Sequence, residues 1–207
     1  MEHAVAALAD AGFDLAHGFD VDVVAREPGL ERLASAGPER AGLLVGNTRA
    51  LWPKFVEAMR DPALAADPDP LERYTERTLS AIFGGARIYY GHRHYDGAFL
   101  PLQRLAVASG LGALAASHLV IHPIYGPWFA LRAAVVIAGP APRAMPVIAQ
   151  PCQCAAACTQ ALTAALASRA DKRAWLAVRD ACTLRAWRYG EDQLRYHYGQ
   201  AWADCDP

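Results

Sequence analysis

The chain has 207 residues, of which 54% are hydrophobic and 20% charged, and its formal net charge is −1. This length and composition predict one folded domain over residues 1–207 and exclude a disordered chain. The balanced charge argues against a nucleic-acid-binding protein, and no uncharged apolar run reaches the roughly 18 residues that a membrane-spanning helix needs.

The N-terminal segment MEHAVAALADAGFD predicts a short amphipathic helix that ends at Gly12. It lacks the positively charged start of a secretory signal. Five cysteines occur, an odd number, so we expect reduced thiols and a cytoplasmic location rather than a disulfide framework. They are Cys152, Cys154, Cys158, Cys182 and Cys205.

The next segments predict a strand followed by helices. AGLLVG (41–46) indicates a buried strand, after which Asn47 or Thr48 can cap a helix to about Arg60. Asp69, Pro70 and Glu72 mark the start of another helix, which should end near Phe83 at two glycines.

The rest of the chain mixes strand and helix signals. Residues 86–95 have β-type character, and 101–109 predict a helix that stops at Gly110. Residues 113–121 and 127–139 read as strands of an antiparallel hairpin, and 151–168 and most of the remaining C-terminal residues read as helices. This order favours an α+β fold with an antiparallel sheet over a doubly wound parallel sheet.

Arg132 interrupts the apolar strand segment in HPIYGPWFALRAAVVIAG (122–139). Alternation places Trp128 and Arg132 on one face of the strand and Phe129 on the other. One interpretation is an ion pair with a core carboxylate or a charge on a solvated face. The other is a guanidinium that holds a ligand carboxylate.

Two glycines and several histidines are further candidates. Gly110 and Gly112 leave room for a flat ligand near the backbone, although such a pair is more often only a turn. His92 and His94 would share a strand face, but no third metal ligand is placed, so a polar strand end is preferred. His122 could cap a turn or contact a ligand.

The cysteines at 152, 154 and 158 lack the spacing of an iron–sulfur or zinc motif. Buried thiols, or thiols at the start of a helix, are the preferred interpretation. A redox thiol of low pKa at the helix N-terminus is the alternative. We therefore expect no metal held by protein side chains.

Several segments together resemble the CblC family of cobalamin-processing proteins, also called MMACHC. HPIYGPWFALR (122–132) is the most specific of them. The resemblance extends at low identity over most of the chain, through residues 12–33, 43–59, 67–79, 173–182 and 188–198. The cobalamin domain of epoxyqueuosine reductases and reductive dehalogenases is also similar, but the cysteine run that comes after it there is degenerate here.

The resemblance implies a flavin-reductase (nitroreductase)-like antiparallel sheet flanked by helices. It implies removal of the upper axial ligand of cobalamin, by thiol-dependent dealkylation or reductive decyanation. Gly110 and Gly112 would face the corrin, beside a pocket shaped by further residues. These are His122, Tyr125, Gly126, Trp128 and Phe129.

The same resemblance implies that arginines hold the carboxylates of glutathione or another thiol. Arg132 and Arg179 match two of them, but the third position falls near Ala203, Asp204 and Cys205, where no arginine stands. A cobalamin carrier without turnover and a flavin-dependent reductase are the alternatives, and reduced flavin is a candidate electron donor. A downstream cobalamin acceptor and a monomer or weak homodimer are also expected.

Overall fold

The computed structural model describes residues 2–34, 37–142, 148, 152 and 154–199. Its centre is a four-stranded sheet in the order β1-β2-β8-β3. The strands are β1 (Leu15–Asp20), β2 (Ala41–Asn47), β3 (Arg87–Tyr90) and β8 (Ala130–Ile137). Every neighbouring pair is antiparallel. The expected α+β fold with an antiparallel sheet flanked by helices is confirmed.

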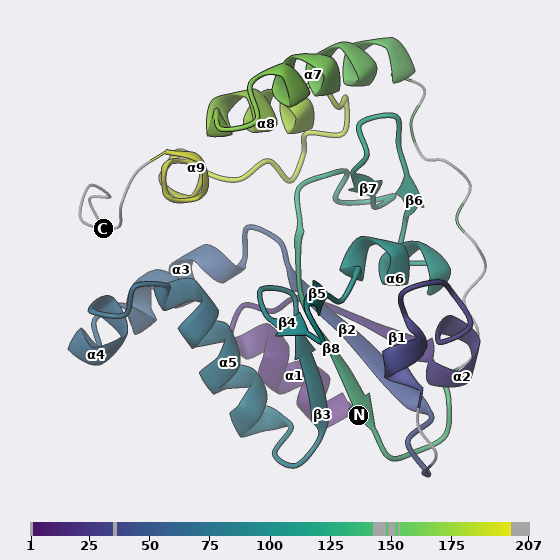
Figure 1. Cartoon of the computed structure of the whole chain (residues 1–207). Helices are drawn as coiled ribbons and strands as arrows, with labels where there is room; N and C mark the ends of the chain where they lie inside the picture. The colour runs from purple at the N-terminus through teal and green to yellow at the C-terminus, as the bar shows by residue number, and fades with distance from the viewer. Residues whose placement is uncertain (1, 35–36, 143–147, 149–151, 153, 200–207) are drawn as a thin grey trace.

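Helices cover both faces of this sheet (Figure 1). One face carries α1 (Glu2–Asp10), α3 (Leu51–Ala58), α4 (Pro62–Ala65) and α5 (Pro70–Ile82). The other carries α2 (Val21–Val24), the 3₁₀ helix η1 (Glu31–Leu33) and α6 (Leu102–Ala108). All seven residues of β2 are therefore buried, and this explains why its sequence is apolar throughout instead of alternating.

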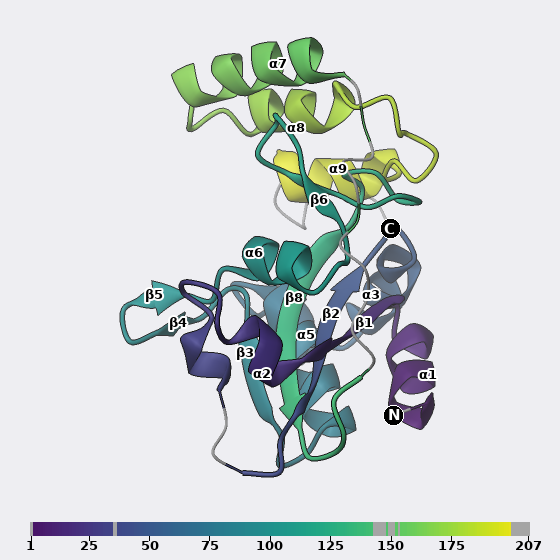
Figure 2. The ribbon, with the colours of Figure 1, turned by 90° about the vertical axis from the view of Figure 1, so that its right-hand side faces the viewer.

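The C-terminal helices α7 (Ala155–Ala167), α8 (Lys172–Asp180) and α9 (Glu191–Tyr198) gather beyond one end of the sheet (Figures 1 and 2). Two small strand pairs complete the described structure. They are β4 (His94–Tyr95) with β5 (Ala98–Phe99), and β6 (Ala113–Leu114) with β7 (Val120–Ile121). No helix within the described ranges is long and apolar enough to cross a membrane.

The expected hairpin between 113–121 and 127–139 is wrong. Residues 113–121 fold back on themselves as β6 and β7, while β8 pairs with β2 and β3. The reason is the burial of β8: Val135 and Val136 lie against opposite helical layers, and only a central place in the large sheet covers both. Residues 86–95 likewise divide into β3 and β4.

The helix boundaries agree with the sequence signals with small differences. The first helix ends before Gly12, whose φ of +88° suits glycine, and α5 begins at Pro70 as expected. The side chain of Asp69 makes no capping hydrogen bond to α5. The helix α3 begins at Leu51, later than expected, after a turn in which the hydroxyl of Thr48 accepts from the amide of Ala50 and donates to the carboxylate of Asp14.

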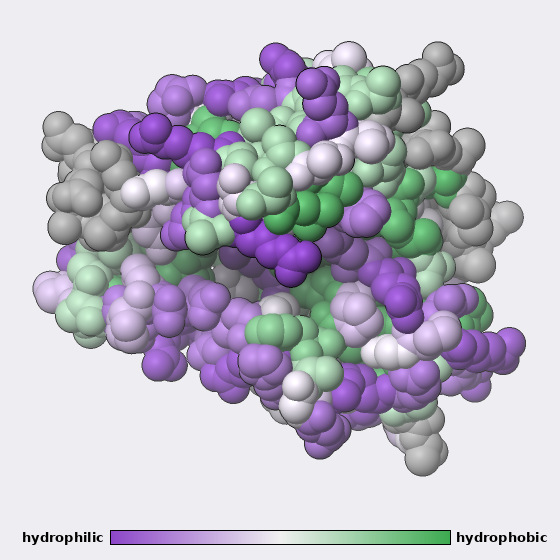
Figure 3. Space-filling model, turned by 45° about the horizontal axis from the view of Figure 1, so that its top comes forward, coloured by the Kyte–Doolittle hydropathy of each residue, from purple (hydrophilic) through white to green (hydrophobic). Residues whose placement is uncertain are grey.

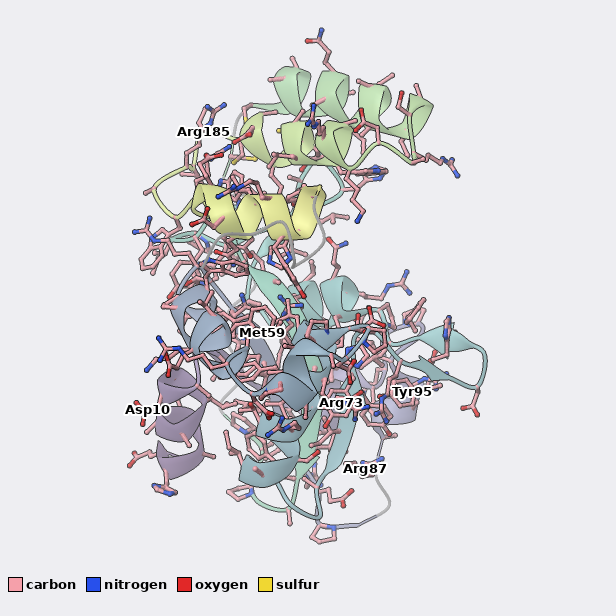
Figure 4. The ribbon with its side chains drawn as sticks, turned by 90° about the vertical axis from the view of Figure 1, so that its left-hand side faces the viewer. Asp10, Met59, Arg73, Arg87, Tyr95 and Arg185 are labelled. Carbon is pink, nitrogen blue, oxygen red and sulfur yellow. The ribbon has the colours of Figure 1, made fainter. Side chains whose placement is uncertain are left out.

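At the end of the sheet that lies far from the C-terminal helices, polar contacts join β3 to the segment before β2. Arg87 donates to a carboxylate oxygen of Glu39 at 2.9 Å, and its other nitrogens reach the carbonyls of Leu33 and Ala34. Figure 4 labels Arg87 at this end of the molecule and Arg185 beside the C-terminal helices at the other. The opposite end of the sheet carries the candidate site.

A glycine in β2 tests the packing across the sheet. A Cβ at Gly42 would lie 2.0 Å from Cε2 of Phe19, whose ring covers it from β1. We expect Gly42→Ala to lower the free energy of unfolding by about 1–3 kcal/mol, because the ring must move out of a packed position. Urea denaturation measures this change. Gly84→Ala is the control, because a Cβ at Gly84 would lie 3.7 Å from the nearest atom and meets no crowding. Equal midpoints for the two variants would contradict the packing described.

Candidate functional site

An open cleft of about 480 Å³ lies where the sheet meets the C-terminal helices. Its wall is mainly apolar and comes from the start of α6, the loop before β7 and the start of β8, together with one charged residue of α8. Its lining includes Leu102, Gln103, Val120, Phe129, Leu131 and Arg179. The volume lies within the range of about 300–1,000 Å³ usual for small-molecule sites. Figure 3 shows the surface hollowed near its centre, where hydrophilic and hydrophobic side chains meet.

The glycines at 110 and 112 shape the backbone beside the cleft. Gly110 ends α6 with a φ of +77°. A Cβ at Gly112 would lie 2.6 Å from the carbonyl oxygen of Ile121, so this glycine allows β6 to pack closely on β7. Both residues are buried. Packing thus accounts for Gly112 without a ligand, and the corrin contact expected for the pair stays a prediction.

His122 caps the turn that leads into β8. Its Nδ1 accepts hydrogen bonds from the amides of Ile124 and Tyr125, at 3.1 and 3.3 Å, and its ring stacks on Tyr125 at 4.4 Å between centroids. Burial, with a smaller effect of His17, lowers the pKa of His122 to about 4. The imidazole is therefore neutral near pH 7 and holds the turn, which is one of the two roles expected for it.

Gly126 closes the same turn against the C-terminal segment. It is buried with a φ of +59°, and a Cβ there would lie 2.5 Å from the carbonyl oxygen of Leu184. The backbone of Gly126 exchanges two hydrogen bonds of 2.9 Å with that of His122. The turn is thus fixed between β7 and the residues that come after α8.

Trp128 and Phe129 point to opposite sides, as alternation predicted. Phe129 lines the cleft and packs in the core that contains α6. Trp128 is completely buried and packs against Tyr189 and Leu194. Trp128 therefore supports the wall of the site from behind, and its expected part in shaping the pocket is indirect.

Arg132 occupies a β-bulge. Val45 of β2 pairs with Ala133 and Gly46 pairs with Leu131, so Arg132 has no partner in that register. A bulge of this kind redirects a side chain. The Nε of Arg132 donates to Oδ1 of Asn47 at 2.7 Å, and Nη2 is buried with no hydrogen-bond partner in the described structure.

Arg179 approaches the same strand from α8. Its Nη1 donates to the carbonyl oxygens of Pro127 and Phe129, at 2.8 and 3.3 Å, and its guanidinium lies 5.8 Å from the ring centroid of Tyr189. The positive charge of Arg179 is close enough to contribute to the lowered pKa of Arg132. The structure thus brings together the two arginines that the sequence singled out.

These two arginines differ from the other half-buried arginines. Arg32, Arg87 and Arg188 each form an ion pair with a carboxylate. Arg132 and Arg179 form none within the part of the chain that the structure describes, so the expected core ion pair of Arg132 is not found there. Burial lowers the pKa of Arg132, and the charges of Tyr189, Tyr196 and Glu72 offset this in part. A buried guanidinium without a carboxylate partner is suited to an anionic ligand.

In the described part of the chain, further buried polar atoms without hydrogen-bond partners belong to Trp128, to Tyr189 that packs on it, and to Gln193 of α9. They are Nε1 of Trp128, the hydroxyl of Tyr189, and both amide atoms of Gln193. Because buried polar groups are normally satisfied, such a group of atoms indicates bound water or a polar ligand. Sequence reasoning missed Tyr189, Gln193 and His197; the signal was that 188–198 belongs to the matching segments.

His197 on α9 completes this region. Burial, reinforced by the charges of Arg132 and Arg179, lowers its pKa to about 3. A cleft that borders Arg132 also contains His197, Tyr196 and Lys172. The neutral imidazole therefore adds no further positive charge to a cleft that already contains Arg132 and Lys172, together with the carboxylate of Glu72.

The remaining candidates include His92, which lines a second cleft next to the first, together with Arg132. His92 contacts a carboxylate oxygen of Glu76 at 2.9 Å, whereas His94 packs on Phe99, so the two histidines do not converge. No cluster of three or more histidine, cysteine or acidic residues in the described ranges could hold a metal ion. Residues 203–205, where a third arginine was sought, lie outside the described residues.

The fold has a known relative. It matches the crystal structure of the C. elegans B12-trafficking protein CblC, a human MMACHC homologue, with a TM-score of 0.60. The match covers 99% of this chain and 92% of that one, at 16% sequence identity. No family model and no curated protein matches the sequence. The structural likeness agrees with the resemblance found in the sequence and shows a shared fold.

The pKa of His197 predicts a pH dependence of stability. Because the folded value is below the unfolded value of about 6.5, the unfolded chain takes up the proton first and stability falls as the pH drops below about 6.5. Between pH 7 and pH 5 the free energy of unfolding should fall in both chains. We expect the fall to be smaller in His197→Gln than in the unsubstituted chain, by up to about 2 kcal/mol. Urea unfolding at each pH measures this, with the exposed His118→Gln as control. Parallel losses in all three proteins would contradict the assignment.

Proposed function

We propose that this protein binds a cobalamin in the cleft and removes its upper axial ligand with the help of a small thiol. The observation that carries the proposal is a pair of half-buried arginines beside an open, mainly apolar cleft, neither of which pairs with a carboxylate of the described residues. The shared fold with a B12-trafficking protein supports the choice of substrate.

The cleft wall suits one edge of a large flat ligand. Leu102, Val120 and Phe129 offer an apolar surface, while Gln103 can hydrogen-bond side-chain amides of a corrin. The adjoining cleft shares Gly91 and Leu131 with the first. A ligand larger than 480 Å³ would therefore extend along this surface rather than be enclosed.

The arginines would bind the carboxylates of the thiol. Arg132 lines two clefts, and its guanidinium can donate to a carboxylate oxygen there while Nε keeps its bond to Asn47. A charge-assisted hydrogen bond of this kind contributes about 1.5–3 kcal/mol. Two cations at fixed positions orient the thiol, and this positioning is the catalytic contribution that we assign to the chain.

The chemistry is a displacement at carbon. The thiolate sulfur attacks the cobalt-bound carbon, the electron pair of the Co–C bond remains on cobalt, and a thioether and cob(I)alamin form. Removal of cyanide needs an electron donor instead, for which a reduced flavin is the candidate. We place the reaction in the cytoplasm, in a monomer or weak homodimer that passes its product to an acceptor protein.

The sequence near the C-terminus modifies this proposal. Ala203, Asp204 and Cys205 supply no third arginine. Without one charge-assisted contact, affinity for glutathione falls by about tenfold or more. A smaller thiol with one carboxylate is therefore a suitable co-substrate, and a carrier without turnover is the alternative that this departure favours.

The first test is spectroscopic. On mixing with methylcobalamin, we expect the absorbance spectrum to shift to that of the base-off form, because the fold would hold the cofactor without its benzimidazole on cobalt. Addition of glutathione without oxygen should then produce cob(I)alamin. An unchanged spectrum on mixing would refute cobalamin binding, and a base-off spectrum that no thiol or reduced flavin alters would select the carrier.

The second test separates thiol binding from cobalamin binding. We expect Arg132→Met and Arg179→Met each to lower kcat/KM for the thiol by about tenfold to a hundredfold, because each loses a charged hydrogen bond worth about 1.5–3 kcal/mol. The base-off spectrum should persist in both. Arg173→Met, an exposed position on the same helix as Arg179, is the control. Unchanged thiol kinetics in both cleft variants would remove the arginines from the mechanism.

A further inference from the structure

A second group of reactive side chains lies outside the residues that line the cleft. Cys152, Cys154, Cys158 and Cys182 are all free thiols in the described structure. The Sγ atoms of Cys154 and Cys158 are 3.5 Å apart. The ionisation of each of the four is affected by at least one of the others, so they form one thiol cluster.

The fold brings these thiols together from two segments. Cys154 immediately precedes α7 and Cys158 lies one turn later, so their side chains share a helix face. The helix α8 packs beside α7, and Cys182 lies just beyond its end (Figure 2). Cys152 and Cys182 pack with Ile121 of β7. The cluster is therefore a product of tertiary packing.

The two closest thiols have different environments. Burial opposes ionisation of Cys154, but hydrogen bonds from Cys158 and from the backbone of Thr183 outweigh it, and the pKa of Cys154 is lowered. Cys154 is half-buried and Cys158 is buried. Burial, together with the neighbouring Cys154, raises the pKa of Cys158 to about 12. One thiol is thus accessible and more easily ionised, and the other is shielded beside it.

A metal site does not explain this arrangement. The described cysteines do not converge on a point in the geometry that three or more ligands require. A covalent structural role is also absent, since all four are free. The distance of 3.5 Å exceeds a disulfide bond by about 1.5 Å, so a small shift at the first turn of α7 would join the two sulfurs.

We propose that Cys154 and Cys158 form a redox-active pair that reacts with low-molecular-weight disulfides. The thiolate of Cys154 attacks one sulfur of the disulfide and releases one thiolate, which leaves a mixed disulfide on Cys154. Cys158 loses its proton to solvent and attacks the Cys154 sulfur, which releases the second thiolate. Two cysteine thiols are oxidised to one disulfide, and the small disulfide is reduced to two thiols.

Cystamine is a suitable probe because it carries no carboxylate, so it does not depend on Arg132 or Arg179. Trypsin cleavage after Arg143 and Arg169 leaves three cysteines in one peptide, so the experiment uses the Cys152→Ser chain. After incubation without oxygen, acid quenching and alkylation, we expect this peptide to have lost two hydrogens. Treatment with dithiothreitol should restore its mass.

Variants in the same background identify the roles. Cys158→Ser should stop at a stable cysteamine adduct on Cys154, because the resolving thiol is missing. Cys154→Ser should leave Cys158 unmodified at the same time point. Cys182→Ser is the matched control and should still form the disulfide. Circular dichroism shows whether each variant is folded.

A measurement on the unsubstituted protein keeps the test independent of any folding defect. In a short pulse of iodoacetamide at pH 7.5, we expect Cys154 to be alkylated at least tenfold faster than Cys158. Zinc bound to the purified protein in stoichiometric amount, a disulfide to Cys182 instead, or equal alkylation rates would overturn the proposal. Cobalamin binding is measured separately, so either proposal can fail without the other.

Discussion

The pairing of β2 with β8 is the constraint on which the site depends. Both strands are covered on both faces, so their register is fixed by packing along nearly their whole length. The one irregularity is the bulge at Arg132, next to Asn47 at the end of β2. A central strand of the sheet thus carries a cation at the edge of a cleft.

The cost of burying that charge explains the surroundings of Arg132. A guanidinium removed from water needs an anion or several hydrogen bonds. The chain supplies Asn47 and a set of tyrosines, and burial keeps His197 neutral. At the other end of the sheet, Arg87 has Glu39 and two carbonyls. Arg87, which has a carboxylate partner, is thus a structural arginine, whereas the surroundings of Arg132 are suited to a ligand.

The C-terminal helices connect the cleft with the thiol cluster. The last turn of α8 brings Arg179 to the backbone of Pro127 and Phe129, and three residues later Cys182 lies among the thiols. Gly126 holds the turn before β8 against Leu184. The segment from 179 to 184 therefore contacts the cleft, the thiol cluster and the turn at 122–126. Both proposed sites depend on how this segment packs.

The sequence by itself determined the fold class and most of the helices, and the resemblance it carries singled out Arg132 and Arg179 as candidates. Periodicity, proline and glycine mark such features locally, as at Gly12 and Pro70, and the segment around Arg132 carried the resemblance that the structural match supports. Only the tertiary structure decided the partner strands of β8, because an apolar strand can pair with any neighbour that covers both its faces. The tertiary structure also created the bulge at Arg132. This bulge arises because β8 has one residue more than β2 at this point of the register, and no residue type signals it. The packing of α7 beside α8 likewise joins Cys182 to thiols about 25 residues earlier, a contact that spacing along the chain does not encode.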